Sequence, residues 1–248
     1  SPGSNGTQMR YTLHFSNAKQ YFVHLETPVD RQEQMLQLQA WVLALKDSLS
    51  KVLNETITEP RGFLILLNKE VTDDDLKTAL EKTWAATAQR SVFSYKKWEF
   101  PFYKSAETSH DLEDYFKGDT QAIAAYWEAF LSHILKVQFY GFQPGFVYLQ
   151  GLPSSLHLPR QGKGALEVPV GAVAVGERYV GIYPQNSPGG WQIIGLSPVS
   201  LFDRKRKPIF LLEPGDTIQW KEVDAHTYKK LKTKPRYIPN YQDEKIVL

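Results

Sequence analysis

The sequence predicts an α+β protein in two parts, a small N-terminal α+β domain followed by an all-β part that is a barrel or a sandwich. Up to about residue 105, strand-like alternation and helical periodicity take turns along the chain. From residue 136 onward, short apolar runs are separated by Gly and Pro turns, a pattern typical of barrels and sandwiches. Two helical segments connect these regions.

The chain opens with a polar leader and a predicted hairpin. Residues 1–8 are small and polar, and we expect them to be a disordered leader. Tyr11, Leu13 and Phe15 then alternate with polar residues, and a second apolar run follows at 21–25. Two such runs joined by a short polar turn predict antiparallel strands.

The rest of the N-terminal domain alternates helix and strand. Apolar residues at three- and four-residue steps predict a helix over 31–53, with Asp30 as its cap. The run 63–67 predicts a buried strand, and Thr72 precedes a second helix. The strand predicted over 97–103 completes the domain.

The predicted boundaries follow from these patterns. The N-terminal α+β domain spans 9–105, a helical connection spans 106–135, and the β-rich domain spans 136–222. The basic tail, 223–248, contains the charge run Lys229 to Lys234, for which we expect a loosely ordered, solvated helix.

Composition excludes several classes of function. The 29 basic and 27 acidic residues leave a net charge of +2, which does not favour nucleic-acid binding. Cysteine is absent, which excludes disulfides and thiolate chemistry and is compatible with a cytoplasmic location. No run of about eighteen apolar residues occurs, so we expect no membrane span.

Glycine, proline and aromatic residues concentrate between Gly141 and Asp203. The segments are GFQPGFVYLQGLP from residue 141, Pro159-Arg160, and GIYPQNSPGGW from residue 181. Glycine permits close backbone approach, and proline fixes one backbone dihedral, so together they indicate rigid loops. The residues predicted to bind a substrate or partner are Gly141, Phe142, Pro144, Gly145, Phe146, Tyr148, Gly151, Pro153, Pro159, Ser187, Pro188, Gly189, Gly190 and Trp191.

The aromatic residues of these segments have two interpretations. Tyr148, Tyr183 and Trp191 combine an apolar body with a polar tip, which suits the wall of a pocket or an interface. Alternatively, they fill a barrel core while the Gly and Pro pairs turn corners.

These segments resemble the KipI family, also described as allophanate hydrolase subunit 1 or as the B-type subunit of 5-oxoprolinase. The family signature runs G-F-x-P-G-F-x-Y-L-x-G-L-P, then P-R, V-P-x-G, G-I-Y-P-x-x-S-P-G-G-W and I-G, and the chain matches long stretches of it at 141–153 and 181–191. The match is thinner before Lys136, where Phe100 to Tyr103 and Asp111-Leu112 resemble family elements.

The resemblance implies a fold, an activity and partners. It implies a small N-terminal α+β domain and a C-terminal cyclophilin-like β-barrel. It also implies a subunit that, with C-type (KipA-like) and A-type subunits, opens 5-oxoproline to glutamate using ATP. Other relatives imply a carboxyltransferase or allophanate hydrolase-type subunit, or a non-catalytic inhibitor of a histidine kinase.

The chain departs from the family where the family is polar. Gly164-Ala165 replaces a second P-R pair, Tyr179-Val180 replaces Q-T, and Leu196 replaces an arginine. Arginine binds carboxylates and phosphates through paired charge-assisted hydrogen bonds, so these changes remove polar groups expected at an anionic-substrate pocket. The chain is therefore identified as a divergent member.

Three polar residues remain as catalytic candidates: Arg160, His157 and Tyr183. Arg160 is expected to clamp a carboxylate or similar oxyanion, or alternatively to pin its own loop through backbone carbonyls. A free imidazole has a pKa near neutrality, so His157 is a candidate proton shuttle, or alternatively a surface histidine.

The sequence contains no phosphate-binding P-loop, dinucleotide fingerprint or H-E-x-x-H helix, so ATP is expected to bind through the complex. No metal site is predicted, because the consecutive carboxylates at 73–75 fit the first turn of a helix. The preferred hypothesis is a non-autonomous subunit of a 5-oxoprolinase-like hydrolase.

Overall fold

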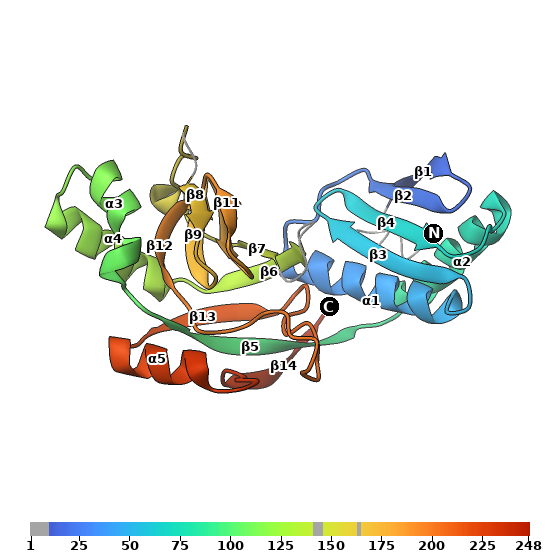
Figure 1. Ribbon diagram of the computed structural model, residues 1–248. Coiled ribbons are helices and arrows are strands. Elements are labelled where there is room, and N and C mark those ends of the chain that lie inside the picture. Colours follow the sequence, from blue (N-terminus) through green and yellow to red (C-terminus); the bar gives the residue numbers. More distant parts are fainter. Residues whose placement is uncertain (1–9, 141–145, 163–164) are drawn as a thin grey trace.

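The computed structural model describes residues 10–140, 146–162 and 165–248, and its two lobes are each built on a separate β-sheet (Figure 1). The N-terminal lobe contains a four-stranded sheet in the order β1-β2-β4-β3. Its elements are β1 (Tyr11–Asn17), β2 (Gln20–Leu25), α1 (Gln32–Ser48), β3 (Leu53–Glu59), β4 (Gly62–Leu67) and α2 (Asp73–Ala88).

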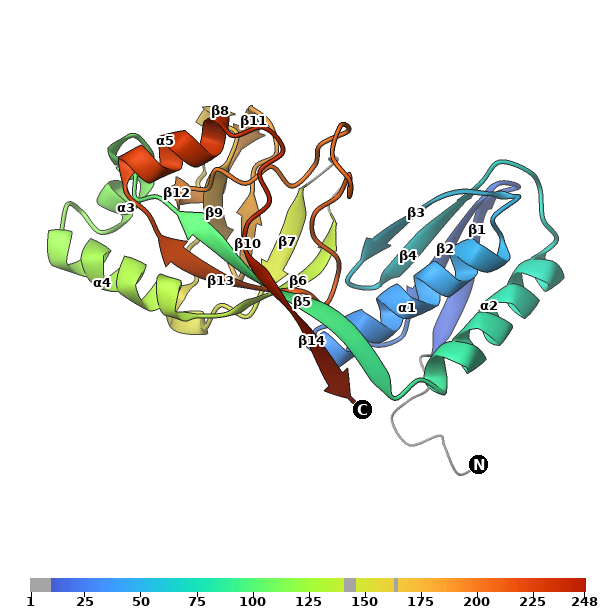
Figure 2. The ribbon, with the colours of Figure 1, turned by 90° about the horizontal axis from the view of Figure 1, so that it is seen from below.

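Both helices of this lobe cover one face of its sheet, which leaves the lobe with two layers (Figure 2). Trp41 of α1 is fully buried between them, and its indole donates to the Thr83 hydroxyl of α2 at 3.0 Å. Its ring packs against Phe63 of β4, with ring centroids 5.3 Å apart. The apolar stripe of α1 thus joins the second helix to the sheet.

The predicted hairpin, the strand near 63–67 and the Thr72 cap are confirmed. The Thr72 hydroxyl accepts a hydrogen bond from the Asp75 amide at 3.1 Å. The predicted Asp30 cap is wrong, because helix α1 is capped at Arg31, where the Gln34 side chain accepts from the Arg31 amide at 3.1 Å. The helix also ends at Ser48, so that the segment from Leu53 onward forms a strand.

The larger lobe contains an eight-stranded mixed sheet in the order β12-β9-β10-β7-β6-β13-β5-β14 and a two-stranded sheet of β8 and β11. Its strands are β5 (Val92–Phe102), β6 (Leu135–Tyr140), β7 (Val147–Gln150), β8 (Ala165–Val168), β9 (Ala172–Gly176), β10 (Tyr179–Ile182), β11 (Ser187–Gly189), β12 (Gln192–Leu196), β13 (Thr217–Glu222) and β14 (Tyr241–Val247). The α+β class is confirmed, whereas closure into a barrel stays a prediction.

Strand β5 lies in the larger sheet and not in the N-terminal domain, where the sequence placed the strand 97–103. It pairs in parallel with β13, with Lys97 opposite Thr217, and antiparallel with β14. These partners are more than a hundred residues away in sequence, so no local pattern indicates the pairing.

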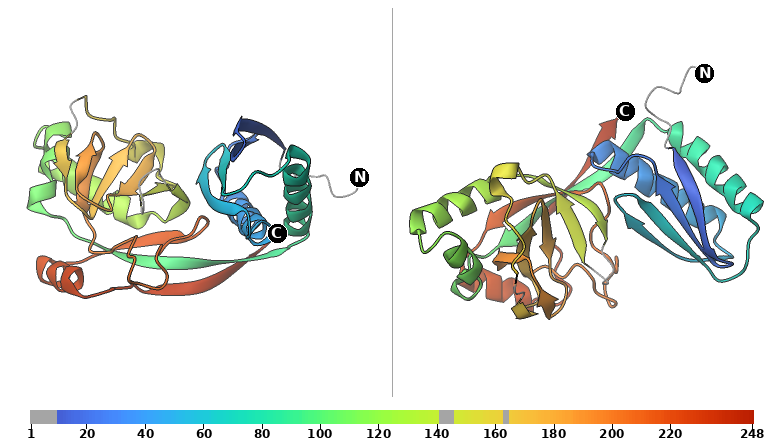
Figure 3. Two further views of the ribbon diagram at one scale, coloured as in Figure 1. Left: turned by 45° about the vertical axis from the view of Figure 1, so that its right-hand side comes forward. Right: turned by 90° about the horizontal axis from the view of Figure 1, so that it is seen from above.

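The C-terminal tail is ordered rather than loosely helical. It forms α5 (Ala225–Thr233), capped by the Asp224 side chain, and then β14 at the edge of the large sheet. The long strands β5 and β14 run together beneath both lobes (Figure 3). The exact domain boundaries otherwise remain predictions.

The segment between β5 and β6, two strands of the large sheet, forms the short helices η1 (Ala106–Thr108) and α3 (His110–Tyr115) and the longer α4 (Thr120–Ser132), and α3 and α4 lie at the end of the larger lobe away from the N-terminal lobe (Figure 1). Another short helix, η2 (Ser154–Leu156), follows β7. The Tyr126 hydroxyl of α4 donates to the Leu156 carbonyl at 2.8 Å, which ties α4 to the loop that carries the candidate residues 157–160.

Side-chain hydrogen bonds to backbone carbonyls join the lobes. Gln138 of β6 donates to the Val29 carbonyl at 2.6 Å, and Gln32 of α1 donates to the Gly215 carbonyl at 3.0 Å. A side chain at Gly215 would overlap Leu36 of α1, so glycine permits this close approach. In the part of the chain that the structure describes, no helix is long and apolar enough to cross a membrane.

Candidate functional site

The motif residues that the structure describes meet in one aromatic cluster on β7, β10 and the following turns. We call Phe146, Tyr148, Tyr179, Tyr183 and Trp191 the aromatic cluster. The Phe146 ring lies 5.2 Å from Tyr148, 5.5 Å from Tyr183 and 5.7 Å from Trp191, as measured between centroids. The structure therefore brings together motif residues that are far apart in the sequence.

Gly181 of β10 lies beneath this cluster, and its missing side chain makes room for the rings. A Cβ atom there would lie 2.8 Å from the Phe146 ring and 2.9 Å from the Trp191 ring. A side chain at Gly189 would overlap the Tyr183 hydroxyl. These two glycines of the motif thus allow aromatic rings to lie directly on the backbone.

Arg160 is exposed and lies at the edge of the aromatic cluster. Its guanidinium carbon is 5.9 Å from the centroid of the Trp191 ring, within the range of a cation–π interaction. Among the described residues its side chain makes no ion pair or hydrogen bond. The arrangement leaves the fork open to a carboxylate or phosphate.

Two tyrosine hydroxyls accompany the guanidinium. Burial raises the pKa of Tyr148 and of Tyr183, and the positive charge of Arg160 opposes both shifts. Both hydroxyls therefore stay protonated at neutral pH and can donate hydrogen bonds. The exposed cation Arg160 and the half-buried hydroxyl-bearing Tyr148 are suited to an anionic group, whereas Tyr183 is buried.

The loop that carries Arg160 is held by hydrogen bonds from β12 and the turn before it. Gln192 donates through Nε2 to the Pro159 carbonyl at 2.9 Å, and the Gln161 amide donates to the Gly190 carbonyl at 2.8 Å. These contacts bond the two sequence neighbours of Arg160, Pro159 and Gln161, to β12 and to Gly190. The loop is therefore fixed on both sides of Arg160 without use of the guanidinium.

His157 has a different environment. Its Nε2 lies 2.9 Å from the Leu152 carbonyl oxygen, and since a carbonyl only accepts, Nε2 carries the proton. The imidazole therefore holds the loop after β7, and only Nδ1 is left for proton transfer. Gly151, in this loop, has φ +115°, and a side chain there would crowd the Ile134 carbonyl.

Some predicted residues cannot be placed. Gly141, Phe142, Pro144 and Gly145 lie outside the described residues, as does Gly164. The side chains of Ser187 and Ala165 are also outside the described part, although their backbones belong to β11 and β8. Pro153 precedes η2, and Pro188 lies within β11.

At three positions where the family has polar residues, this chain has Tyr179, Val180 and Leu196, whose side chains make apolar contacts. Tyr179 packs on Tyr148 with centroids 5.6 Å apart, Val180 is fully buried, and Leu196 is buried in the same apolar cluster as Trp191. The substitutions therefore suit their surroundings and leave no buried polar group without a partner at these three positions.

Two contributors were not predicted from the sequence. Phe139 of β6 stacks on Tyr148 with centroids 4.4 Å apart, and Arg178 donates through Nη2 to the Tyr179 hydroxyl at 2.7 Å. Arg178 directly precedes Tyr179, and this pairing of a basic with an aromatic residue was the sequence feature that could have indicated their contact. Among the described residues, no group of three or more His, Asp and Glu side chains is placed to hold a metal ion.

Comparisons with known proteins identify the family of the chain. Residues 11–212 match the family model for the carboxyltransferase domain, subdomains C and D. The B-type subunit of the Haemophilus influenzae 5-oxoprolinase is 33% identical over 184 residues, which cover 74% of this chain and 86% of that protein.

Two solved structures share the fold. The protein TTHA0988 has a TM-score of 0.64 and 25% identity, over 83% of this chain and 40% of that one. The Kluyveromyces lactis urea amidolyase has a TM-score of 0.73 and 13% identity, over the whole of this chain and 17% of that one. The chain thus spans less than half the length of either solved protein. By its family match and its relatives, the chain belongs to the carboxyltransferase subdomain C and D family, together with the B-type subunits of 5-oxoprolinases.

Proposed function

We propose that this chain is the B-type subunit of a 5-oxoprolinase-like enzyme, which converts 5-oxoproline to glutamate with ATP only when a C-type subunit is bound. The observation that carries the proposal is the relationship to the B-type subunit of 5-oxoprolinase over most of the chain. ATP is handled by the complex, which also includes an A-type subunit, and the complex is cytoplasmic.

The aromatic cluster with Arg160 supports this proposal chemically. The 5-oxoproline molecule carries one carboxylate on a small lactam ring, so a guanidinium can bind its carboxylate while aromatic faces contact the CH₂ groups of the ring. In this proposal Arg160 binds the carboxylate, Tyr183 donates to it, and His157 holds the adjoining loop or shuttles a proton through Nδ1. The cyclophilin-like closure of the β-rich lobe belongs to the same proposal.

The test is reconstitution with purified subunits. The chain alone, with 5-oxoproline and ATP, is expected to release no glutamate, and adding C-type and A-type subunits is expected to produce turnover. Turnover by the isolated chain would contradict the proposal. In the complex, Arg160→Ala is expected to raise KM for 5-oxoproline by about tenfold or more, through loss of one charge-assisted contact. The matched control is Arg61→Ala, an exposed arginine of the N-terminal lobe outside the aromatic cluster.

A second candidate is a non-catalytic regulator, such as an inhibitor of a histidine kinase. The apolar contacts of Val180 and Leu196, at positions where the family is polar, favour it. A third, a carboxyltransferase or allophanate hydrolase-type subunit, is favoured by the family match. Inhibition of a histidine kinase would identify the second candidate. Biotin-dependent carboxyl transfer without 5-oxoproline turnover would identify the third.

A further inference from the structure

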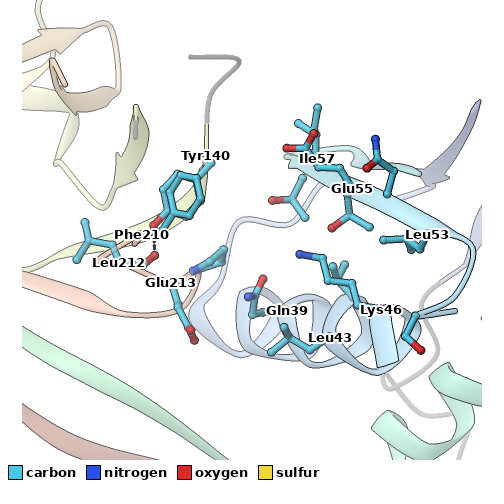
Figure 4. Close-up of a pocket in the computed structure, with 16 residues that line it drawn as sticks. Gln39, Leu43, Lys46, Leu53, Glu55, Ile57, Tyr140, Phe210, Leu212 and Glu213 are labelled. Carbon is cyan, nitrogen blue, oxygen red and sulfur yellow. Dashed lines mark hydrogen bonds between the residues drawn. The ribbon is translucent and has the colours of Figure 1, made fainter. Parts of the chain in front are cut away.

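A groove separates the two lobes on the side opposite the long strands, and it shares no lining residue with the aromatic cluster (Figure 4). Its volume is about 800 Å³. One wall comes from α1 and β3, and the other from the end of β6 and the segment before β13. The lining residues used below are Leu43, Lys46, Glu55, Ile57, Tyr140 and Phe210.

The walls of the groove expose apolar side chains from both lobes. Leu43 of α1 is 47% exposed, and Phe210 on the opposite wall is 45% exposed. The Phe210 ring packs edge-on against Tyr140, with centroids 5.3 Å apart. Tyr140 is held in turn by a hydrogen bond from its hydroxyl to the Leu212 carbonyl. The apolar surface is therefore fixed in place before anything binds.

Strand β3 is the outermost strand of the N-terminal sheet on the groove side. It pairs with β4 on one side; β6 of the larger lobe lies close to it, but among the described residues no strand pairs with its other edge. Residues Leu53 to Thr58 of this strand line the groove. An edge strand offers a row of backbone donors and acceptors that an extended segment can join.

A cationic hairpin borders the same groove. The chain from Ser200 to Leu212 folds back on itself, with Phe202 bridged to Phe210. Arg206 is buried at its centre and donates to the carbonyls of Ser200 at 2.7 Å and Pro208 at 3.0 Å. These bonds hold the hairpin from inside.

Three other cations of the hairpin are exposed: Arg204, Lys205 and Lys207. Among the described residues none of them lies within ion-pair distance of a carboxylate. Arg204 lies 5.9 Å from the Phe202 ring, and Phe202 packs against Phe210 of the groove wall. The positive charge is therefore continuous with the apolar groove.

The charges inside the groove differ from those at its border. Lys46 lies on one wall, and Glu55 and Glu213 also line the groove, so the interior has little net charge. A complementary occupant would be uncharged and partly apolar along β3 and acidic where it reaches the hairpin. The seven residues of β3 extend about 23 Å at about 3.3 Å per residue, a length that fits an extended chain better than a small molecule.

We propose that this groove receives an extended segment of the C-type subunit, which adds to β3 as a strand and places its acidic end on Arg204, Lys205 and Lys207. The inference rests on the proposed function, since the C-type subunit is the partner that function requires. It assigns the contact with the partner to the inter-lobe groove and leaves the aromatic cluster for substrate.

The test uses calorimetry to measure binding of the purified C-type subunit. The first variant combines Arg204→Glu, Lys205→Glu and Lys207→Glu. The control combines Lys77→Glu, Lys82→Glu and Lys229→Glu, which make the same charge change at exposed positions of α2 and α5. Hydrogen exchange of the β3 amides is followed with and without the partner, and thermal melts check that both variants fold.

The inference expects the hairpin variant to bind at least about tenfold more weakly and with less salt dependence, because it reverses three charges at the border of the interface. The control is expected to bind like the wild type, and the β3 amides to gain protection. Equal binding by the hairpin variant, or unprotected β3 amides in a formed complex, would overturn the inference and leave the proposed function standing.

Two further outcomes are distinct. If the wild-type chain shows no binding to the C-type subunit, the proposed function fails and the inference fails with it. If the chain alone forms a dimer that the hairpin variant breaks, the occupant is a second copy, and the assignment to the C-type partner is refuted. Sedimentation of each variant separates these outcomes.

Discussion

Asp216 has a buried carboxylate that accepts three hydrogen bonds. Removing this carboxylate tests how β5, which pairs with β14, is held to the rest of the sheet. Its side chain is 4% exposed. One oxygen accepts from the Lys96 amide at 3.0 Å, and the other accepts from the Trp98 indole and the Glu213 amide, each at 3.0 Å. The carboxylate thus joins β5 to the turn before β13.

The size of the effect follows from the groups left without partners. Asp216→Ala removes the acceptor for three N–H donors, and each buried donor without a partner costs about 1–3 kcal/mol, so we expect a loss of about 3–5 kcal/mol after partial relaxation. Asp216→Asn keeps one acceptor oxygen and turns an amide toward a donor, for which we expect about 1–3 kcal/mol.

The assay is urea unfolding of both variants, followed by tryptophan fluorescence and by circular dichroism. The control is Asp243→Asn, an exposed aspartate on β14 whose carboxylate lies 3.6 Å from the Lys96 ammonium. As a surface pair it is expected to contribute less than about 1 kcal/mol. A loss below about 1 kcal/mol for Asp216→Ala would refute the reasoning.

The dependence on pH has a defined sign. Burial raises the pKa of Asp216, and the three donors lower it only in part. A carboxyl whose pKa is higher in the folded state contributes stability below its unfolded pKa, near about 4, and loses it as pH rises through the folded pKa. The cost of Asp216→Asn is therefore expected to shrink as pH rises from about 4.

The remaining predictions concern local packing. Gly181→Ala is expected to lower the free energy of unfolding in urea by about 1–3 kcal/mol, because the added methyl group would press on the Phe146 and Trp191 rings. The control Gly162→Ala adds a methyl group to open space and is expected to change the free energy of unfolding little. Arg206→Met should speed tryptic cleavage at Arg204 and lower stability by about 1–3 kcal/mol, through carbonyls left without donors; unchanged cleavage would contradict the role assigned to the buried guanidinium. Tyr126→Phe should cost about 0.5–1.5 kcal/mol, and an unchanged midpoint would show that its hydrogen bond is replaced by water.

Local patterns predicted most individual elements but not their assembly. The hairpin at 11–25 and the helix beginning after Thr72 depend on neighbours in sequence, and both were predicted. The position of β5 depends on partners near residues 217 and 241, and it was assigned to the wrong lobe. Strand β14 alternates exposed and half-buried residues over part of its length. Because several of these residues are charged, the alternation does not stand out as a strand pattern in the sequence.

For the candidate site too, the residues within local motifs were predicted, and those that depend on pairing between distant segments were not. Phe146, Tyr148, Tyr183 and Trp191 were singled out as motif residues, and the structure places their rings in contact with one another, while their role in binding stays a prediction. Phe139 lies in an ordinary strand pattern, and only the pairing of β6 with β7 brings its ring onto Tyr148. Asp216 looks like a turn residue in sequence, because the donors that it satisfies come from elsewhere in the fold.

The substitutions at the family's polar positions bear on which function the chain retains. Val180 and Leu196 are buried, so an arginine or a Gln-Thr pair there would need buried partners, and the surroundings now offer apolar contacts instead. Arg160, by contrast, lies at the surface of the cluster, with its loop fixed through Pro159. The buried polar groups have thus been exchanged for packing, while the exposed cation remains. In the proposed function Arg160 is therefore the one group among these positions left to bind a carboxylate, and Arg160→Ala is expected to separate a substrate site from a scaffold more sharply than any change in the cluster.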